Sequence, residues 1–466
     1  MEYVNDKLEE FNNYLVGRKV AIIGLGVSNL PLLDYLHANN AIVKIFDEKD
    51  IDNIPNEIMD KVTKYSMEFS LGKNCLSELK GFDLIFRSPS CLPTRAELVE
   101  EENRGAVVTT EIELLMKMCP CPVIGITGSD GKTTTTTLIY KILKNAGYNC
   151  FLGGNIGIPL FTKLNEMTPE DIVVLELSSF QLIGMQVSPQ ISVITNITPN
   201  HLNIHKDYEE YIDSKKNIFR YQDKGGTLIL NYDNVITRVC ESEANGNVIF
   251  FSSKEKLDNG YIVDEDIIKE CDDKVRKHIL DTKQLLIKGK HNYENICAAI
   301  AATKNLVPIE KAVQTIKEFT GVEHRIELVR TIDNVRWYND SASSSPTRTL
   351  SALNAFDEEI ILIAGGYDKK LDYEPLAKPI VDKVKALILI GQTSEKIFNA
   401  VKDELDLEHK YMDIYQCDTL EQTVQIANKI AKPNQVVIFS PASASFDMFK
   451  NFADRGNQFK NLVNNL

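Results

Sequence analysis

The stretch Gly125-Ile126-Thr127-Gly128-Ser129-Asp130-Gly131-Lys132-Thr133 decides the fold of the middle of this 466-residue chain. It follows the apolar run Val123–Ile126 and opens the amphipathic segment Lys132–Ala146, so the sequence predicts a strand, a glycine turn and a helix. Glycines let successive backbone N–H groups point at phosphate oxygens, a lysine supplies a cation and a threonine hydroxyl can bind magnesium. A packing turn with a chance lysine is the alternative. The stretch predicts an ATP or GTP site, in the short T-G-x-x-G-K-T form rather than the standard Walker spacing, with the nucleotide-binding residues Gly128, Ser129, Asp130, Gly131, Lys132, Thr133 and Thr134.

Three further residues carry chemistry in the same region. Glu176 ends the apolar strand 172–176, and a carboxylate at the carboxyl end of a parallel strand points into the ligand crevice, where it could hold magnesium. His201 follows the strand predicted over 191–194, and Lys215 lies on a predicted helix. Taken singly, a histidine here is more often packed or on the surface, a lysine is usually solvated, and the glutamate could bond a neighbouring loop.

The first part of the chain predicts a second nucleotide-binding unit. An apolar strand over 19–24 ends in glycine, a helix is predicted from Ser28 to Ala38, and the strand over 42–46 ends at Asp47. This is the pattern of a nucleotide-binding βαβ unit. The lone Gly24-Leu25-Gly26 is weak evidence for NAD, and a turn that merely packs is the alternative. Further strands are predicted over 83–86 and 106–108.

Two joints divide the chain into three predicted domains. The first is the proline-punctuated Cys119–Pro122, and the second is Gly321 with residues 323–325. We expect domains over 1–119, 120–322 and 323–466, with strands at 227–230 in the second and at 359–364, 386–390 and 435–440 in the third. The charged stretch 252–283 is expected to form short antiparallel strands and a loop on the surface. The predicted fold class is α/β, with an N-terminal Rossmann-like domain, a central P-loop ATPase-like parallel sheet and a C-terminal Rossmann-like domain.

The composition is that of an acidic globular protein, with 43% hydrophobic residues, 25% charged residues and a formal net charge of −14. This charge argues against non-specific binding to nucleic acid or to an anionic membrane, because both require a positive surface. The polar N-terminus does not resemble a secretory signal, and no apolar run approaches the ~18 residues of a membrane span. The nine scattered cysteines have no framework spacing, so we expect a cytoplasmic protein in a reducing environment.

The motifs occur in the order seen in Mur ligases, and the chain resembles that family over essentially its whole length. The motifs are Thr127–Thr133, Gly153–Gly157, Glu176–Gln181, Asn196–His201, His291-Asn292, His324-Arg325, Asn339–Ser341 and Ser440–Ser445. The resemblance implies an ATP-dependent ligase that activates a carboxylate as an acyl phosphate and joins it to an amine, with Mg²⁺ beside the ATP. Gly24–Gly26, Ser88-Pro89 and Asn451–Asn457 favour the member of the family that adds D-glutamate to UDP-N-acetylmuramoyl-L-alanine, expected as a monomer.

The resemblance also implies roles for individual residues. The catalytic set is Lys132, Glu176, His201 and Lys215, of which the last three, together with Thr133, bind the metals, Lys215 as a carbamate formed with carbon dioxide. For ATP, the implied residues besides the loop are Asn292 at the adenine, Arg325 at the phosphates and Asp340 at the ribose. For the other substrates they are Val27, Ser28, Asp47 and Lys49 at the uridine diphosphate, Asn155 at the muramoyl group, Lys369, Ser445 and Phe452 at D-glutamate, and further Ser178 and Phe446.

One departure from the family and three rival functions stay open at this point. The family usually has Asp-Ser-Lys-Ala-Thr where this chain has Asp340-Ser341-Ala342-Ser343-Ser344, so Ala342 removes a lysine. The rivals are another ligase of the group with a different amino acid or a folate substrate, an NAD-dependent oxidoreductase, and a nucleotide-binding switch without catalysis.

Overall fold

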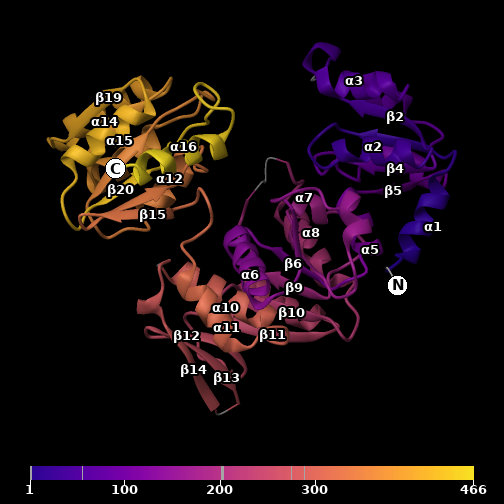
Figure 1. Cartoon of the computed structure of the whole chain (residues 1–466), viewed down its shortest axis with the longest axis horizontal. Helices are drawn as coiled ribbons and strands as arrows, with labels where there is room; N and C mark the ends of the chain where they lie inside the picture. Colours follow the sequence, from indigo (N-terminus) through magenta and orange to yellow (C-terminus); the bar gives the residue numbers. More distant parts are fainter. Residues whose placement is uncertain (1–2, 55, 201–203, 274, 288) are drawn as a thin grey trace. The chain divides into compact units, whose positions relative to one another are not determined.

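The computed structural model describes residues 3–54, 56–200, 204–273, 275–287 and 289–466. Three sheets follow one another along this part of the chain, each with its own helices (Figure 1). Contacts divide the chain into two compact units, residues 1–285 with 290–317, and residues 286–289 with 318–466. The first unit holds two of the sheets and the second unit holds the third. The predicted α/β class with three consecutive sheets is confirmed, whereas the domain boundaries stay predictions.

The first sheet and its helices are formed by α1 (Asp6–Leu15), β1 (Lys19–Ile23), α2 (Leu30–Ala38), β2 (Ile42–Asp47), η1 (Ile51–Asn53), α3 (Asn56–Lys64), β3 (Glu68–Leu71), η2 (Cys75–Glu78), β4 (Leu84–Arg87), α4 (Ala96–Asn103), β5 (Val107–Thr109) and α5 (Glu111–Met118). The strands are parallel in the order β3-β2-β1-β4-β5. The strand order reverses between β1 and β4, and open α/β sheets bind ligands at such a point. There, a Cβ on Gly24 would lie 2.8 Å from Oγ of Ser88, so the turn after β1 requires glycine.

The central sheet and its helices are formed by β6 (Val123–Thr127), α6 (Lys132–Ala146), β7 (Cys150–Gly154), η3 (Phe161–Glu166), β8 (Ile172–Glu176), α7 (Ser179–Leu182), β9 (Ile191–Ile194), α8 (Tyr208–Arg220), β10 (Thr227–Asn231), α9 (Val235–Val239), η4 (Cys240–Glu243), β11 (Asn247–Ser252), β12 (Gly260–Asp264), β13 (Ile267–Asp272), β14 (Val275–Asp281), η5 (Thr282–Gln284), α10 (Lys290–Thr303) and α11 (Ile309–Glu318). The strand order is β14-β13-β12-β11-β10-β9-β6-β8-β7. Ile124 and Ile126 of β6 are fully buried, and each such side chain contributes about 1.5–3 kcal/mol of hydrophobic stabilisation.

The antiparallel strands predicted within residues 252–283 are confirmed as β12, β13 and β14. They are not a separate surface element, because β12 pairs in parallel with β11 and so extends the central sheet. The alternation of apolar and polar residues is weak here, so the sequence does not show this pairing.

The third sheet and its helices are formed by β15 (Glu327–Ile332), β16 (Val335–Asn339), α12 (Pro346–Leu353), β17 (Ile360–Ala364), α13 (Glu374–Lys383), β18 (Val384–Ile390), α14 (Ser394–Glu408), β19 (Asp413–Cys417), α15 (Leu420–Ile430), β20 (Val436–Phe439) and α16 (Phe452–Asn464). The strand order is β15-β16-β20-β17-β18-β19, and β15 alone of these strands is antiparallel to its neighbour. The order reverses between β17 and β20, so the loops that follow these two strands border the crevice.

Within the first unit, a buried carboxyl group links α5 to the segment after β7. Glu111, the first residue of α5, accepts a hydrogen bond on Oε1 from the backbone N–H of Phe161 at 2.8 Å. Burial raises the pKa of Glu111 to about 7, although the N–H groups of Phe161 and Leu160 act in the opposite direction. The carboxyl group is therefore largely protonated in the folded chain at slightly acidic pH.

Replacement of Glu111 with glutamine is expected to change how stability depends on pH. Because the folded pKa is raised, the native carboxyl group adds most to stability below its ordinary pKa of 4.5, and this contribution is lost as the pH rises through about 7. Glutamine keeps an acceptor for Phe161 but cannot ionise, so the variant gains up to roughly 3 kcal/mol relative to the native chain over that range. Urea unfolding across the range measures the difference. Glu170→Gln, at an exposed position, is the control. If the free energy of unfolding depends on pH in the same way for Glu111→Gln and the native chain, the prediction is wrong.

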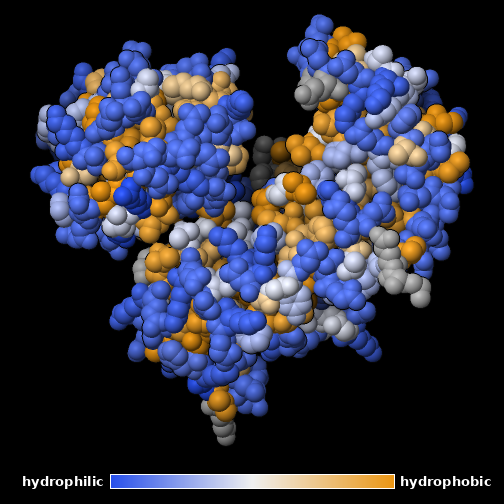
Figure 2. All heavy atoms as spheres, viewed as in Figure 1, coloured by the Kyte–Doolittle hydropathy of each residue, from blue (hydrophilic) through white to orange (hydrophobic). Residues whose placement is uncertain are grey.

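The described surface is mainly hydrophilic on the face shown in Figure 2, with apolar residues in smaller areas. The exposed large apolar residues include Val27, Phe446 and Phe452, which are three of the predicted substrate positions. Among the residues that the structure describes, no helix is both long enough and apolar enough to cross a bilayer.

Candidate nucleotide- and substrate-binding site

The glycine turn between β6 and α6, residues 127–133, is confirmed as a tight loop and is called the phosphate loop below. Gly128 has φ 150° and Gly131 has φ 78°, and a Cβ on Gly128 would lie 1.9 Å from Oγ1 of Thr195. The Lys132 ammonium donates to the carbonyl oxygens of Gly128 and Ser129 at 2.8 and 2.9 Å. The lysine is therefore folded back along the loop, with its charge at the N-terminus of α6, a kind of helix end that favours anions.

The segment after β9 lies against this loop. Ser129 Oγ donates to the Thr198 carbonyl at 2.8 Å and lies 2.9 Å from the Tyr211 hydroxyl of α8. The Asp130 N–H donates to Asn196 Oδ1 at 3.0 Å. These bonds hold the phosphate loop against the segment after β9 and against α8. The sequence did not indicate these contacts.

Glu176 ends β8, as predicted, and it pairs with Ile126 of β6, the strand that leads into the phosphate loop. Its Oε1 accepts from Asn155 Nδ2 at 2.7 Å, so two residues predicted for different ligands lie in contact. Its Oε2 is buried and has no hydrogen-bond partner among the described residues. A buried oxygen without a partner costs about 1–3 kcal/mol, and such an oxygen suits a ligand that the chain itself does not supply. A Cβ on Gly154 would lie 2.1 Å from the Glu176 carbonyl, which explains the glycine before Asn155.

Lys215 lies under the phosphate loop rather than in solvent. The residue is 1% exposed, and its Nζ donates to Gly128 O at 2.9 Å and to Thr127 Oγ1 at 3.3 Å. Burial, and then the charge of Lys132, holds the pKa of Lys215 well below its usual range. A lysine of this kind is available as a neutral amine, which is the form that reacts with electrophiles.

Two further predicted positions of this region complete the description. Thr133 is buried in the first turn of α6, beside Thr134. His201 lies outside the described residues.

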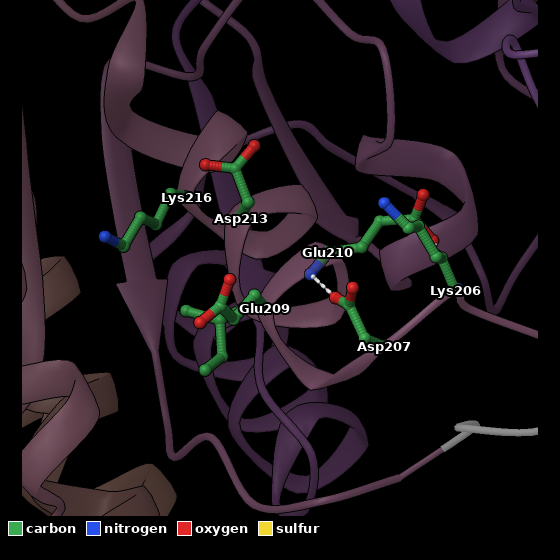
Figure 3. A pocket seen from close by; sticks show the side chains of 7 residues that line it. Lys206, Asp207, Glu209, Glu210, Asp213 and Lys216 are labelled. Atoms are coloured by element: carbon green, nitrogen blue, oxygen red, sulfur yellow. Dashed lines mark hydrogen bonds between the residues drawn. The ribbon is translucent and has the colours of Figure 1, made fainter.

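The outer face of α8 carries charged side chains of both signs (Figure 3). They border a shallow hollow, in which Asp207 caps the helix by accepting from the Glu210 N–H at 2.8 Å. Tyr211, Ser214 and Lys215 lie on the opposite, buried face. The hollow is therefore separate from the phosphate loop; it is lined by Lys206, Asp207, Glu209, Glu210, Ile212, Asp213 and Lys216.

The predicted uridine diphosphate residues lie in the turn after β1 and at or just after the end of β2, next to the reversal point of the first sheet. Asp47 is buried, and it accepts from the N–H groups of Leu25 and Lys49 at 2.8 and 3.0 Å. The carboxylate therefore shapes the turn after β1. Val27, 77% exposed, and Ser28 follow in that turn.

Helix α10 carries Asn292 and packs on α6. Asn295, one turn later, lies 3.2 Å from Thr135 Oγ1, and a Cβ on Gly131 would lie 2.4 Å from Asn295 Oδ1. This contact places the start of α10 near the phosphate loop.

In the second unit, Asp340 follows β16 and is buried. Its Oδ2 accepts from Ser440 Oγ at 2.6 Å and its Oδ1 from the Ile326 N–H at 3.2 Å. Burial raises the pKa of Asp340 to about 6, against these hydrogen bonds. Arg325, next to Ile326, belongs to the same loop. Asp340 thus ties the loops before β15 and after β20 together.

The predicted D-glutamate residues lie in the loops after β17 and β20 and at the start of α16. The Lys369 Nζ lies 5.9 Å from the centroid of the Phe446 ring. Ser445 is buried, whereas Phe446 and Phe452 are 61% and 47% exposed. The Phe452 carbonyl accepts from Ser341 Oγ at 2.8 Å.

The sequence did not single out Arg455 as a functional residue, and the structure places it under these loops. It is 1% exposed, and it donates to the carbonyl oxygens of Ser341, Ser443 and Ala444 at 2.8, 3.1 and 2.8 Å. Burial lowers the pKa of Arg455 to about 10. This guanidinium joins α16 to the loops after β16 and β20, and its contact with Ser341, 114 residues away along the chain, is revealed only by the tertiary structure.

Ala342 stands at the position where the family usually has a lysine, and the side chain of Arg348 brings a cation close to it. The Arg348 Nη1 donates to the Ala342 carbonyl at 3.2 Å, and Arg348 is exposed. A guanidinium therefore lies beside the position where the family usually has a lysine.

Comparison with known proteins agrees with this arrangement. Residues 126–303 match the Mur ligase middle domain, and residues 324–443 match the Mur ligase glutamate ligase domain. A UDP-N-acetylmuramoylalanine–D-glutamate ligase of Acetivibrio thermocellus is 47% identical over 465 residues, covering 99% of this chain and 100% of the relative. The ligase of the same name from Clostridium tetani is 46% identical with the same coverage.

Solved structures show the same fold at low sequence identity. A UDP-N-acetylmuramate-alanine ligase of Thermotoga maritima superposes with a TM-score of 0.56 at 16% identity, covering 96% of this chain and 99% of that one. MurF of Acinetobacter baumannii gives a TM-score of 0.57 at 14% identity, covering 98% and 99%.

Proposed function

The chain belongs to the Mur ligase family, and on that premise we propose that it joins D-glutamate to UDP-N-acetylmuramoyl-L-alanine with ATP, a step in peptidoglycan synthesis. Sequence identity of 44–47% to ligases of that name, over the full length of the relatives, carries the proposal. The phosphate loop, the Glu176 oxygen that has no hydrogen-bond partner among the described residues, and the buried Lys215 support it, because they supply the chemistry that such a reaction needs.

The reaction that we propose has two steps. The alanyl carboxylate attacks the γ-phosphorus of ATP, so that ADP leaves and an acyl phosphate forms. The amine of D-glutamate then attacks the acyl carbon, and phosphate leaves as the amine loses a proton. Lys132 and the N–H groups of the loop neutralise the phosphate charge that builds up. Water must be kept from the acyl phosphate, and domain closure around the ligands would exclude it.

Magnesium fits the residues of the first unit. Glu176 Oε2 is buried without a described partner, Thr133 is in the first turn of α6, and both are oxygen donors, which Mg²⁺ prefers. We propose that Glu176, Thr133 and His201 would hold it, and that it would shield the crowded phosphate oxygens.

A carbamate on Lys215 completes the proposed site. The lowered pKa of its amine favours the neutral form, which can attack carbon dioxide and release a proton. The product is a carbamate anion next to the phosphate loop. Near the cations of this site, an anion is more stable than the ammonium form of the same buried lysine.

The remaining substrate contacts are proposed from the predicted positions. Those of the second unit are Arg325 and Asp340 for ATP and Lys369, Ser445, Phe446 and Phe452 for D-glutamate. Those of the first unit are Asn292 for ATP and Val27, Ser28, Asp47, Lys49, Asn155 and Ser178 for the uridine nucleotide substrate.

Replacement of Lys369 with methionine is expected to raise KM for D-glutamate by roughly ten- to a hundredfold, the worth of one charge-assisted hydrogen bond. KM for ATP should not change, because Lys369 is proposed to contact only the amino acid. Steady-state kinetics with each substrate varied in turn measures both. Lys370→Met, an exposed neighbour, is the control. An unchanged KM for D-glutamate would remove Lys369 from the site.

The proposed function is tested by phosphate release from ATP with UDP-N-acetylmuramoyl-L-alanine and one amino acid at a time. D-Glutamate, L-glutamate, L-lysine and meso-diaminopimelate are offered separately. Release that depends on D-glutamate alone is the expected result. Release with another amino acid would keep the ligase and change the substrate, and nucleotide binding without release would indicate a switch protein.

A further inference from the structure

A histidine that is not among the proposed catalytic, metal-binding or substrate-binding residues is buried beside the segment that carries Glu176. His205 is 2% exposed, and its Nε2 lies 2.9 Å from Ser179 Oγ. Its Nδ1 lies 3.2 Å from Glu210 Oε2. The ring stacks on Phe180, with 5.0 Å between centroids and 10° between planes. The imidazole is thus held at both nitrogens and on one face.

These partners determine which nitrogen carries the proton. A carboxylate can only accept, so Nδ1–H donates to Glu210, and Nε2 of the neutral ring accepts the hydroxyl hydrogen of Ser179. Oε2 of Glu210 also accepts from the Lys206 N–H at 2.9 Å. The carboxylate is therefore anchored by the backbone, and it orients the ring toward Ser179.

The two partners belong to elements that carry proposed catalytic groups. Ser179 opens α7 directly after the segment that follows β8 and Glu176, while Glu210 is in the first turn of α8, the helix of Lys215. The other side of the segment is fixed by Thr127 Oγ1, which donates to the Leu177 carbonyl at 2.7 Å. His205 is thus a cross-link between the start of α7 and the start of α8, while Asn217 Nδ2 of α8 donates to the Leu182 carbonyl at the end of α7 at 3.0 Å.

We propose that His205 is a positioning residue of the ligase reaction: it locks α7 to α8 and so holds Glu176 and Lys215 at a fixed separation. The proposal rests on the proposed function. A metal held by both residues would require that separation to be constant, because oxygen ligands of Mg²⁺ must lie at nearly fixed distances.

The same geometry has a different use in hydrolases, where serine, histidine and a carboxylate form a nucleophilic triad. Ser179 is 3% exposed, and its hydroxyl lies at the N-terminal end of a packed helix rather than in an open cleft. An acyl group could not reach it without displacing α7. The burial favours the positioning role over a nucleophilic one.

The experiment uses two replacements that each keep one half of the link. In His205→Gln the side-chain amide can reach the place of Nε2 and keep the bond to Ser179, whereas in His205→Asn it reaches only the place of Nδ1. We expect kcat of His205→Asn to fall by about ten- to a hundredfold, the usual effect of losing a group that orients a metal ligand. KM for D-glutamate should stay unchanged, and His205→Gln should recover most of kcat. His278→Asn, on the exposed strand β14, is the matched control.

The link itself is tested by combining His205→Asn with Ser179→Ala. If both remove the same bond, the double variant loses no more kcat than either single one. Full kcat in Ser179→Ala, or additive losses, would overturn the proposal, and this arm decides the matter if His205→Asn does not fold. Covalent labelling of Ser179 by a fluorophosphonate would also overturn it, in favour of a nucleophile. An inactive native chain in the same assay would instead reject the proposed function.

Discussion

Replacing Lys215 with arginine is expected to lower kcat by roughly 10²–10³-fold, the effect of losing a group that stabilises charge in the transition state. The amine is 1% exposed and hydrogen-bonded to Gly128 and Thr127. Arginine keeps a cation but has no amine that can become a carbamate, and its guanidinium stays protonated. A role through charge alone would survive this change, whereas a role as a neutral amine would not.

The measurement is phosphate release at saturating substrates, with and without added bicarbonate. The native chain should lose activity when dissolved carbon dioxide is removed and regain it when bicarbonate is added, while Lys215→Arg should respond to neither. Lys216→Arg is the matched control, since Lys216 is the next residue on α8 and lines the hollow on its outer face (Figure 3). Its ammonium pairs with Glu243. A Lys215→Arg protein with native kcat would rule out the carbamate. Urea unfolding separates a loss of chemistry from a loss of fold, because the larger guanidinium must fit into a buried site.

Replacing Glu176 with glutamine is expected to have the second largest effect, with kcat lower by about 10²-fold and the Mg²⁺ concentration for half-maximal rate higher by about 10- to 100-fold. Glutamine can keep the bond from Asn155 through its amide oxygen, so the shape of the site is retained. What changes is the buried oxygen without a described partner, which becomes an NH₂ group that cannot bind a cation.

A magnesium titration of the rate distinguishes this explanation from general damage. Glu170→Gln, on the exposed turn before β8, should behave as the native chain. If Glu176→Gln loses kcat with the same magnesium dependence, the carboxylate acts elsewhere than on the metal. If the variant resists urea better than the native chain when magnesium is absent, the reason is that glutamine avoids the free-energy cost of burying a carboxylate.

The sequence determined what short-range patterns encode. The phosphate loop was predicted because a strand, glycines and Lys132 stand next to one another, and α6 begins and ends at the predicted residues. The same holds for the strands that end at Glu176 and Asp47, since apolar runs of this length bounded by polar residues are typical of buried parallel strands. The antiparallel pair β15–β16 was missed, because Glu327–Ile332 mixes charged and apolar residues.

The tertiary structure alone decided which predicted residues meet and what their environment is. The sequence could not tell a solvated Lys215 from a buried one, nor show that Asn155 contacts Glu176 or that His205 joins Ser179 to Glu210. Arg455 likewise donates to the carbonyl oxygen of Ser341, 114 residues away along the chain, as well as to those of Ser443 and Ala444 nearby. Secondary structure follows from hydrogen bonds and periodicity within a few residues, whereas burial, pKa and contact depend on which strands pair, and that is settled by packing across the whole domain.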